Sequence, residues 1–299
     1  MSTHNTNMKA FIAEEVSKVR GIAVPVRAGL IERAVVRQAK CSKLHPNPDD
    51  EFCFPDIGPS EAIVSNYMKE YALLKQDPHG TLFRDTNIKE SLMVQKIHPD
   101  GYMILNGHHR WIAAVRTNYP KLKIRIVNLT QEKDVRRMLE HSKHDRRITL
   151  DMEEVVFASG KDTETEKPLG FPFRKFFPER LRLGIPALFS YCVSAGYDIW
   201  LYSSGYESMD YVREIMKLYH APVTGIITGT ARKAPKNSAQ REKLESLVAA
   251  KYSRTLHADL HTLLCIDGGT KEFREFPLSG EIPWAAEIID IIGALDKDA

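Results

Sequence analysis

The sequence has few cysteines and no long hydrophobic run. Its four cysteines lie far apart and include no CxxC pair: Cys41, Cys53, Cys192 and Cys265. This spacing excludes a disulfide framework and favours a reducing compartment. No window approaches about 18 consecutive apolar residues, which argues against a membrane-spanning helix. Glu14 and Glu15 interrupt the segment where a signal peptide needs its apolar run. These absences predict a soluble cytoplasmic protein.

A large excess of one charge is also missing. Lys and Arg total 42 and Asp and Glu total 39, which gives a net charge of +3. So small an excess neither requires nor excludes nucleic acid as a partner. Hydrophobic residues make up 43% and charged residues 27% of the 299 positions, which is typical of globular proteins and excludes general disorder. The length favours two domains.

The pattern of apolar residues predicts two α/β halves. A helical pattern occupies 1–30 and a proline-rich loop 43–60, and the order between 61 and 130 is helix, strand, strand, helix, strand. In the second half, strands alternate with helices, which predicts a mostly parallel sheet covered on both faces. The strands expected there are 148–151 or 155–159, then 197–204, 224–229 and 262–267, with helices at 183–196, 208–220 and 239–253. The break between the halves is expected between 131 and 147.

A polar cluster marks the turn from a strand into a helix in the first half. It reads Asn106, Gly107, His108, His109 and Arg110. Backbone amides at such a turn, together with the helix N-terminus, favour an anion. An arginine can form a fork to phosphate oxygens, and a histidine can donate a proton or a hydrogen bond. The motif predicts a phosphate-binding site, although a capped surface turn or a metal site at the histidine pair is also compatible with it.

The segments around this cluster carry a resemblance to a known family. IGPSE at 57–61, ILNGHHRWIAA and KIRIVNL resemble the nucleotide-binding fold of ParB amino-terminal domains and sulfiredoxin. The GHHR motif is closest to the free-serine kinase branch. That resemblance implies ATP or ADP as a ligand and Glu61 as a base acting on a serine hydroxyl. Asn106 stands where that branch usually has Asp, and His108 stands where sulfiredoxin has its cysteine, so sulfiredoxin's own activity is not expected.

A second group of polar residues follows the strands predicted in the other half. Asp151 and Glu153 come directly after a short apolar stretch, Ser203 closes another strand and Asp267 closes a third. One carboxylate can attack phosphorus while the other protonates the leaving oxygen. A serine at a strand end can bind a phosphoryl oxygen, and a lysine from 233–243 can neutralise its charge. The spacing therefore predicts phosphate-ester chemistry.

These elements resemble the haloacid dehalogenase (HAD) superfamily in their order and in their strand–helix setting. GYDIWLYSSGYES is similar to its second motif and TLLCIDGG to its fourth. The resemblance implies Asp151 as nucleophile, Glu153 as acid/base and Ser203, with Ser204, as phosphate ligands. It also implies Mg²⁺ held by Asp151, Asp267 and the backbone carbonyl of Glu153. The short spacings between the motifs suit a minimal cap.

An alternative alignment of the first strand removes these carboxylates from the site. VVFASGK also reads as a buried strand, and it would put Ala158 and Gly160 in the two acidic positions. Residues 149–156 would then form a capped helix, and the domain would be an inactive scaffold. The site lysine is Lys236 by preference, with Lys233 and Lys243 as the alternatives.

A third segment, RKFFPERLRLG at 174–184, mixes arginines with aromatic residues. This composition suits base stacking combined with phosphate contact. The simpler interpretation is an amphipathic connection that packs Phe176, Phe177 and Leu181 into the core.

Taken together, the sequence predicts an α/β protein of three parts. These are an N-terminal helical extension (1–45), a small ParB/sulfiredoxin-like domain (46–140) and a Rossmann-like HAD domain (147–299). The expected function is an Mg²⁺-dependent phosphatase or phosphotransferase acting on a phosphorylated small molecule or nucleotide, with a nucleotide-binding module that is itself a candidate kinase. The alternative functions are a nucleic-acid-associated nuclease or nucleotide-gated binder with an inactive HAD scaffold, and a nucleotide sensor.

Overall fold

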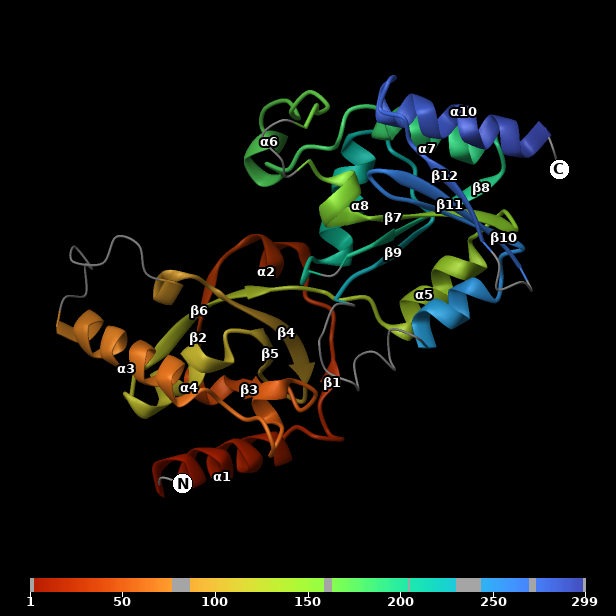
Figure 1. Cartoon of the computed structure of the whole chain (residues 1–299). Helices are drawn as coiled ribbons and strands as arrows, with labels where there is room; N and C mark the ends of the chain where they lie inside the picture. Colours follow the sequence, from red (N-terminus) through yellow and green to blue (C-terminus); the bar gives the residue numbers. More distant parts are fainter. Residues whose placement is uncertain are drawn as a thin grey trace. The chain divides into compact units, whose positions relative to one another are not determined.

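The chain forms two compact units, Met1–Asn128 and Leu129–Ala299, each built on one β-sheet with helices packed against it (Figure 1). The predicted α/β class is confirmed. The division lies a few residues before the interval in which it was expected. The computed structural model describes residues 3–76, 87–158, 163–203, 205–229, 243–268 and 273–297.

The first unit is built on a mixed sheet. Its strands are β1 (Val24–Pro25), β2 (Arg37–Lys40), β3 (Leu44–Pro46), β4 (Leu92–His98), β5 (Tyr102–Asn106) and β6 (Lys121–Ile126). They are ordered β2-β6-β4-β5-β3, and β1 pairs with β4. Pairing is parallel for β4 with β6 and for β3 with β5, and antiparallel for the other neighbours. The two consecutive strands predicted in this half are present as β4 and β5, which pair as an antiparallel hairpin.

The helices of the first unit are α1 (Thr3–Ser17), α2 (Leu30–Ala34), α3 (Glu61–Gln76) and α4 (His108–Arg116). The sheet has one face on the core because β6 alternates charged and apolar residues, so that Leu122, Ile124 and Ile126 are buried. Trp111 of α4 and Tyr71 of α3 are also fully buried in this core. This packing fixes the start of α4, where the predicted phosphate-binding motif lies.

The second unit contains a larger sheet with a parallel centre. Its strands are β7 (Arg146–Asp151), β8 (Tyr197–Tyr202), β9 (Gly225–Ile227), β10 (Arg254–Ala258), β11 (Thr262–Asp267) and β12 (Phe273–Pro277). They are ordered β12-β11-β10-β7-β8-β9. Strands β10, β7, β8 and β9 are parallel to one another. Strand β11 runs antiparallel to β10, and β12 runs antiparallel to β11. Because β8 and β9 lie on one side of β7 and β10 on the other, the strand order reverses between β7 and β10.

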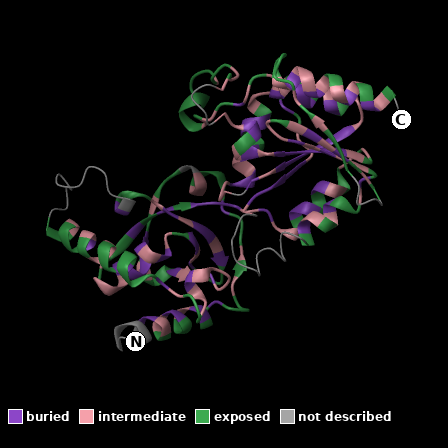
Figure 2. Cartoon of the chain, viewed as in Figure 1, coloured by how far each residue is buried: buried purple, intermediate pink, exposed green. Residues whose placement is uncertain are grey.

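Helices cover both faces of this sheet. The helices of this unit include α5 (Glu132–Glu140), α6 (Phe173–Phe176), α7 (Ile185–Ser194), α8 (Met209–Leu218) and α10 (Trp284–Lys297), and a π-helical turn, η4 (Met152–Val156), follows β7. Figure 1 shows α7 and α10 together on one face and α5 on the other. The central strands β7 and β8 are buried almost throughout, and the exposed residues lie on the outer sides of the helices (Figure 2). In the described part of the chain, every helix falls short of the length or apolar character that a membrane crossing requires.

The structure decides between the two alignments of the first strand. Residues 148–151 belong to β7, whereas Val155 and Val156 are buried in the turn η4, and Phe157 forms only an isolated bridge with Leu181. The alternative with alanine and glycine in the acidic positions is therefore wrong. The strand predicted at 262–267 is present as β11, but it runs antiparallel to its neighbour β10, which was not predicted.

Candidate functional site

Polar side chains follow the carboxyl ends of the four parallel strands in the second unit. β7 ends at Asp151, and Ser203, Thr228 and Asp259 directly follow β8, β9 and β10. The last pair of β7 with β10 is Leu150 with Ala258, so Asp151 and Asp259 are the next residues along the two chains. Open α/β sheets bind ligands outside the carboxyl ends of their strands, at the point where the strand order reverses. This point lies between β7 and β10, so the edge is the candidate site.

Glu153, Ser203 and Gly205 contact one another at this edge. The Oγ of Ser203, a fully buried residue, donates a hydrogen bond to Oε1 of Glu153. The backbone N–H of Gly205 lies 3.3 Å from the same carboxylate oxygen and 3.0 Å from Ser203 Oγ. A β-carbon at Gly205 would lie 3.1 Å from Glu153 Oε1, so glycine permits this close approach. The hydroxyl and the amide thus point two donors at one anionic oxygen, as an oxyanion site does.

Asp151 is held in a defined position at the end of β7. Its Oδ1 accepts a hydrogen bond from Glu154 N–H at 2.8 Å and caps the turn η4. The side chain is only partly buried. A carboxylate fixed through one oxygen keeps its second oxygen available for chemistry. The structure therefore brings Asp151, Glu153 and Ser203 to the same edge of the sheet.

Asp267 lies at the other end of the parallel strands, next to their amino ends. Because β11 is antiparallel to β10, its last residue pairs with Arg254 at the start of β10. The Asp267 carboxylate accepts hydrogen bonds from Arg254 Nε at 2.7 Å and from Arg274 Nη2 at 3.1 Å. The bond from Arg254 is the main reason that the pKa of Asp267 is lowered. A strand of six residues spans about 17 Å, so the predicted Mg²⁺ ligand set of Asp151, Glu153 and Asp267 is wrong.

Asp259 and Thr228 were missed by the sequence analysis. Asp259 follows a strand, RTLHA, that mixes polar and apolar residues and was not recognised. Thr228 is buried, where its Oγ1 accepts a hydrogen bond from Thr130 N–H at 3.2 Å and its N–H donates to Thr130 Oγ1 at 3.0 Å. These bonds fix the chain at the end of β9. The only available signal for either residue was its place directly after a strand.

The donor set at this edge suits a hard divalent cation. In the described part of the chain, no three His, Cys, Asp or Glu side chains form a ready-made metal cluster. Mg²⁺, however, commonly keeps several waters and takes only one or two protein carboxylates together with phosphate oxygens of the substrate. Asp151 and Asp259 leave adjacent strands, whose backbones are about 5 Å apart, and they could supply those two carboxylates.

Of the three lysines considered for the predicted site, only Lys243 belongs to the described residues. Lys236, Lys233 and Ser204 lie outside the described residues. Lys243 is described, and its Nζ forms an ion pair of 2.8 Å with Glu132 on the surface. This ion pair engages Lys243 with the start of α5, and the choice of Lys236 stays a prediction.

In the first unit, Gly107 starts helix α4 in a conformation that favours glycine. Its φ is +102°, and a β-carbon there would lie 2.8 Å from Leu92 Cγ and 3.0 Å from Arg110 Nη2. Because Gly107 has no side chain, it cannot itself cap the first amides of α4. Such a helix start, with backbone N–H groups pointing outward along the axis, is where anions bind.

The two histidines of the motif both pack on Phe52. The His108 ring is buried and stacks on Phe52 at 5.2 Å, and its Nε2 accepts a hydrogen bond from Asn47 N–H at 3.2 Å. The His109 ring meets Phe52 edge-on at 5.1 Å. Its Nε2 accepts from Ser60 N–H at 3.1 Å, and burial lowers the pKa of His109. Both rings therefore position backbone around the start of α4.

Of the other residues predicted for this site, Glu61 and Asn106 are exposed and Arg110 is buried. Glu61 is exposed as the first residue of α3, next to the Ser60 amide that donates to His109. Asn106 is exposed at the end of β5. The Arg110 guanidinium is buried instead, and its Nη1 donates to the Glu90 carbonyl at 2.9 Å. The start of α3 and the start of α4 are thus linked through His109.

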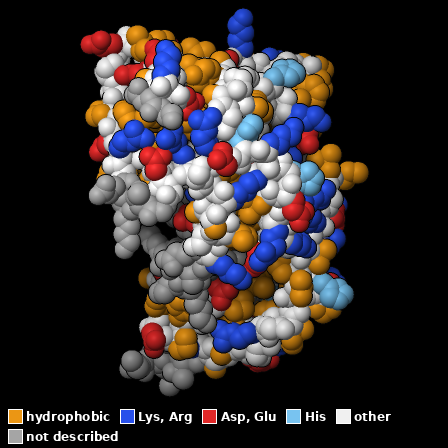
Figure 3. Space-filling view, turned by 90° about the vertical axis from the view of Figure 1, so that its right-hand side faces the viewer, with side chains coloured by type: hydrophobic (Ala, Val, Ile, Leu, Met, Phe, Trp, Pro, Cys, Tyr) orange, Lys and Arg blue, Asp and Glu red, His pale blue; other side chains and the backbone are white. Residues whose placement is uncertain are grey.

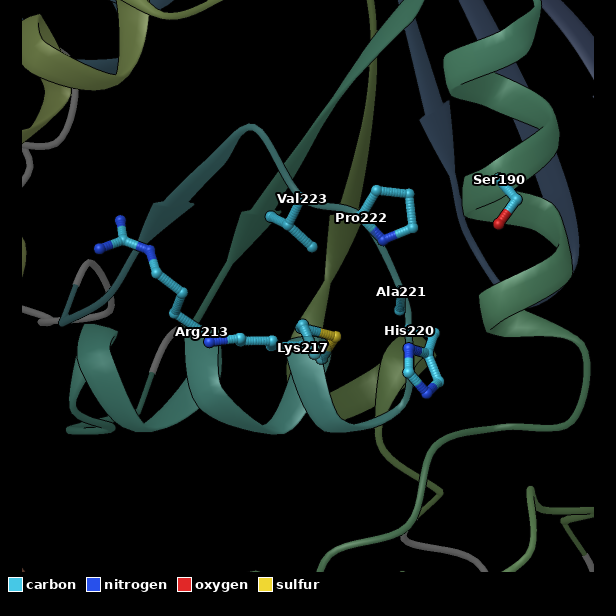
Figure 4. Close-up of a pocket in the computed structure, with 8 residues that line it drawn as sticks. Ser190, Arg213, Lys217, His220, Ala221, Pro222 and Val223 are labelled. Atoms are coloured by element: carbon cyan, nitrogen blue, oxygen red, sulfur yellow. The ribbon is translucent and has the colours of Figure 1, made fainter.

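A separate surface hollow in the second unit lies away from the candidate site. It has a volume of about 470 Å³ and lies between α7 and α8. Arg213 and Lys217 project from α8, and His220 lies just beyond the helix (Figure 4). The hollow is completed by the residues that lead into β9, so it lies at the amino ends of the strands. On the face drawn in Figure 3, Lys and Arg side chains are interspersed with Asp and Glu.

No protein-family model matches the sequence, and no curated protein or solved structure matches the chain.

Proposed function

We propose that the second unit is an Mg²⁺-dependent phosphate-ester hydrolase or phosphotransferase with Asp151 as its nucleophile. One observation carries this proposal. The Glu153 carboxylate accepts from the Ser203 hydroxyl and lies within reach of the Gly205 amide, at the edge where β7 ends in Asp151. A nucleophile, an acid/base and two donors for a phosphoryl oxygen are the groups that this chemistry requires.

Each residue has a defined task in the proposed reaction. A carboxylate oxygen of Asp151 attacks phosphorus, the phosphorus–oxygen ester bond breaks, and the leaving oxygen takes a proton from the Glu153 carboxyl group. Ser203 O–H and Gly205 N–H donate to a phosphoryl oxygen as its charge develops. Glu153 then takes a proton from water, or from an acceptor hydroxyl, that attacks phosphorus and releases Asp151.

A divalent cation suits the carboxylates beside this group. When bound, Mg²⁺ supplies charge neutralisation for the phosphoryl oxygens. Asp151 and Asp259 would hold it, because they are the next residues after the last pair of two adjacent strands. The resemblance of the sequence motifs to those of HAD phosphatases supports this assignment, and Asp259 takes the role that this resemblance implied for Asp267.

An aryl-phosphate hydrolysis assay tests the proposal. We expect the full chain to release phosphate in the presence of Mg²⁺ and to stop when a chelator removes the cation. Acid-quenched samples should carry a phosphoryl group on the peptide that contains Asp151, as measured by mass spectrometry. Hydrolysis that persists undiminished in excess chelator would contradict the cation's role, and a phosphoryl group found elsewhere would contradict the nucleophile.

For the first unit we propose binding of a nucleotide phosphate at the start of α4. The supporting observation is that His109 links the beginnings of α3 and α4 through the Ser60 amide. Two helix N-termini held close together favour an anion between them. Glu61 is exposed at the first position of α3, where a base acting on a hydroxyl substrate would be accessible.

Calorimetry with ADP and ATP tests this second proposal. The full chain is expected to bind one of them, and a Gly107→Val variant should bind it at least about tenfold more weakly because the side chain fills the helix start. Phosphoryl transfer to free serine that is lost in Glu61→Gln would assign the kinase role to Glu61. Equal affinity of wild type and Gly107→Val would refute the binding site.

A further inference from the structure

The segment between β7 and α7 forms an anchored insert in the second unit. Phe157 and Leu181 form an antiparallel bridge, as do Thr165 and Arg182. Across the base of the insert, Arg182 N–H donates to the Val156 carbonyl at 2.9 Å. Leu181 is fully buried in the core. The insert therefore has two paired limbs, and its base is fixed to the sheet.

The tip of the insert is fixed as well. It carries the short helix α6, and the Tyr211 hydroxyl of α8 donates to Glu179 Oε2 and lies 3.2 Å from the Phe176 carbonyl oxygen. The Phe177 ring packs on the Tyr211 ring at a centroid distance of 5.0 Å. These contacts hold the backbone of α6 against α8. The predicted packing of Phe177 and Leu181 is therefore confirmed, whereas that of Phe176 is wrong.

Three phenylalanines of this tip point into solvent instead of the core. Their exposed fractions are 81% for Phe171, 47% for Phe173 and 60% for Phe176. We call these three residues the aromatic platform. Phe173 and Phe176 are three positions apart in one helical turn, so their side chains are neighbours. Exposed apolar groups that are clustered, and held on a fixed backbone, indicate a binding surface.

The platform is basic, and it belongs to the insert that starts at the candidate site. Arg174 and Lys175 lie between its phenylalanines and are exposed, and the stretch from Phe171 to Phe177 contains no acidic residue. The insert begins directly after the turn that Asp151 caps. Figure 1 shows α6 beyond the carboxyl end of β7. Aromatic rings interleaved with basic side chains are the combination that stacks bases and contacts phosphates.

We propose that the aromatic platform stacks on the nucleobase of the substrate, so that the second unit acts on phosphorylated nucleotides. This inference rests on the proposed phosphate-ester chemistry, and it adds the class of substrate. Arg174 and Lys175 bind further phosphate groups of the same ligand. The chemistry is shared by a free nucleotide and by the phosphorylated end of a single strand, and the experiment separates these two sources.

The test compares ligands with and without a base. The full chain is titrated in excess chelator, which prevents turnover, with AMP, ribose 5-phosphate, inorganic phosphate or a short 5′-phosphorylated single-stranded oligonucleotide. Amide hydrogen exchange of peptides covering 170–183 reports binding at the platform and not at the first unit. The variant is Phe171→Ala/Phe173→Ala/Phe176→Ala. The matched control is Phe273→Ala, which removes an equally exposed ring (61%) from β12.

We expect AMP or the oligonucleotide to protect this segment and the triple variant to bind that ligand at least about fivefold more weakly. Phe273→Ala should bind like wild type, and ribose 5-phosphate should bind all variants equally. The better of the two base-containing ligands identifies the source. If inorganic phosphate binds but a base adds no affinity, the platform proposal fails alone. If neither AMP nor the oligonucleotide protects this segment, the platform proposal is overturned. If no phosphate ligand binds at all, the proposed function falls with it.

Discussion

The Ser203 hydroxyl donates to the carboxylate of Glu153, and the amide of Gly205 lies within hydrogen-bonding distance of both side chains. The carboxylate thus occupies the position in which a phosphoryl oxygen would be received. Substrate phosphate must displace it to reach the two donors. In the proposed reaction, the displaced carboxyl group protonates the ester oxygen of the leaving group.

Glu153→Gln tests the two proposed roles of this carboxyl group, which are to donate a proton and to compete with phosphate for Ser203 and Gly205. The amide cannot transfer the proton, so kcat should fall about 10²- to 10⁴-fold. Because a neutral amide competes less with phosphate for Ser203 and Gly205, the inhibition constant of inorganic phosphate should decrease or stay equal. The matched control is Glu154→Gln, whose exposed side chain lies one residue further along η4, and it should behave like wild type. Weaker phosphate inhibition in Glu153→Gln would contradict the competition.

Asp259→Asn tests the cation site. Loss of one of two carboxylates should raise the Mg²⁺ concentration for half-maximal activity at least about tenfold. The measurement is the Mg²⁺ dependence of aryl-phosphate hydrolysis at saturating substrate. Asp259 Oδ1 also accepts from the N–H of the next residue, and asparagine keeps an acceptor oxygen for that bond. An unchanged Mg²⁺ dependence would show that Asp259 is not a ligand.

His109 should make the stability of the first unit depend on pH. Burial lowers the pKa of His109 below its ordinary 6.5. The unfolded ring therefore takes up a proton as the pH falls through 6.5, whereas the folded ring does so only at lower pH. The free energy of unfolding contributed by this group is fully present above 6.5 and decreases as the pH falls below it.

Urea unfolding at a series of pH values measures this dependence. In His109→Gln the decrease below pH 6.5 should become shallower, whatever the absolute stability of the variant. His98→Gln, which changes an exposed histidine of the same unit, should keep the slope of wild type. The same slope in His109→Gln as in wild type would contradict the assignment.

Gly107→Ala should destabilise the first unit through both strain and contact. The residue has φ +102°, and the new β-carbon would meet Leu92 Cγ at 2.8 Å. The expected loss is about 1–3 kcal/mol in the free energy of unfolding. Gly21→Ala is the control, because Gly21 has φ +74° with nothing within 4 Å of an added β-carbon. A loss no larger than that in Gly21→Ala would show that the close packing at the start of α4 contributes nothing.

The sequence was sufficient to predict which segments around the two motifs are helices and which are strands. It was not sufficient to predict the direction of every strand. A short apolar run such as VVFAS is compatible with a strand or with a buried turn, and only packing decides between them. The true first strand, β7, begins with two arginines, and both have partners far along the chain. Arg146 pairs with Asp296 at 2.7 Å, and Arg147 donates to Tyr202 and Thr255.

The error at Asp267 has a different origin. The pattern TLLCID correctly predicts a strand, but periodicity contains no information on whether a strand runs parallel or antiparallel to its neighbour. Because β10 was overlooked, β11 was taken as the next parallel strand, and its last residue was placed at the wrong edge. Glu153 and Ser203 were placed correctly because β7 and β8 are consecutive parallel strands, whose ends must meet at one edge.

The most direct test of the account compares two aspartates at opposite edges of one sheet. Aryl-phosphate hydrolysis is measured with Mg²⁺ for Asp151→Asn and Asp267→Asn in parallel. Asp151→Asn should lose at least about 10³-fold in kcat, because asparagine cannot act as the nucleophile. Asp267→Asn, which alters the ion pairs with Arg254 and Arg274 at the amino ends of the parallel strands, should keep activity close to wild type. Undiminished activity in Asp151→Asn, or equal losses in both variants, would contradict the assignment of the site.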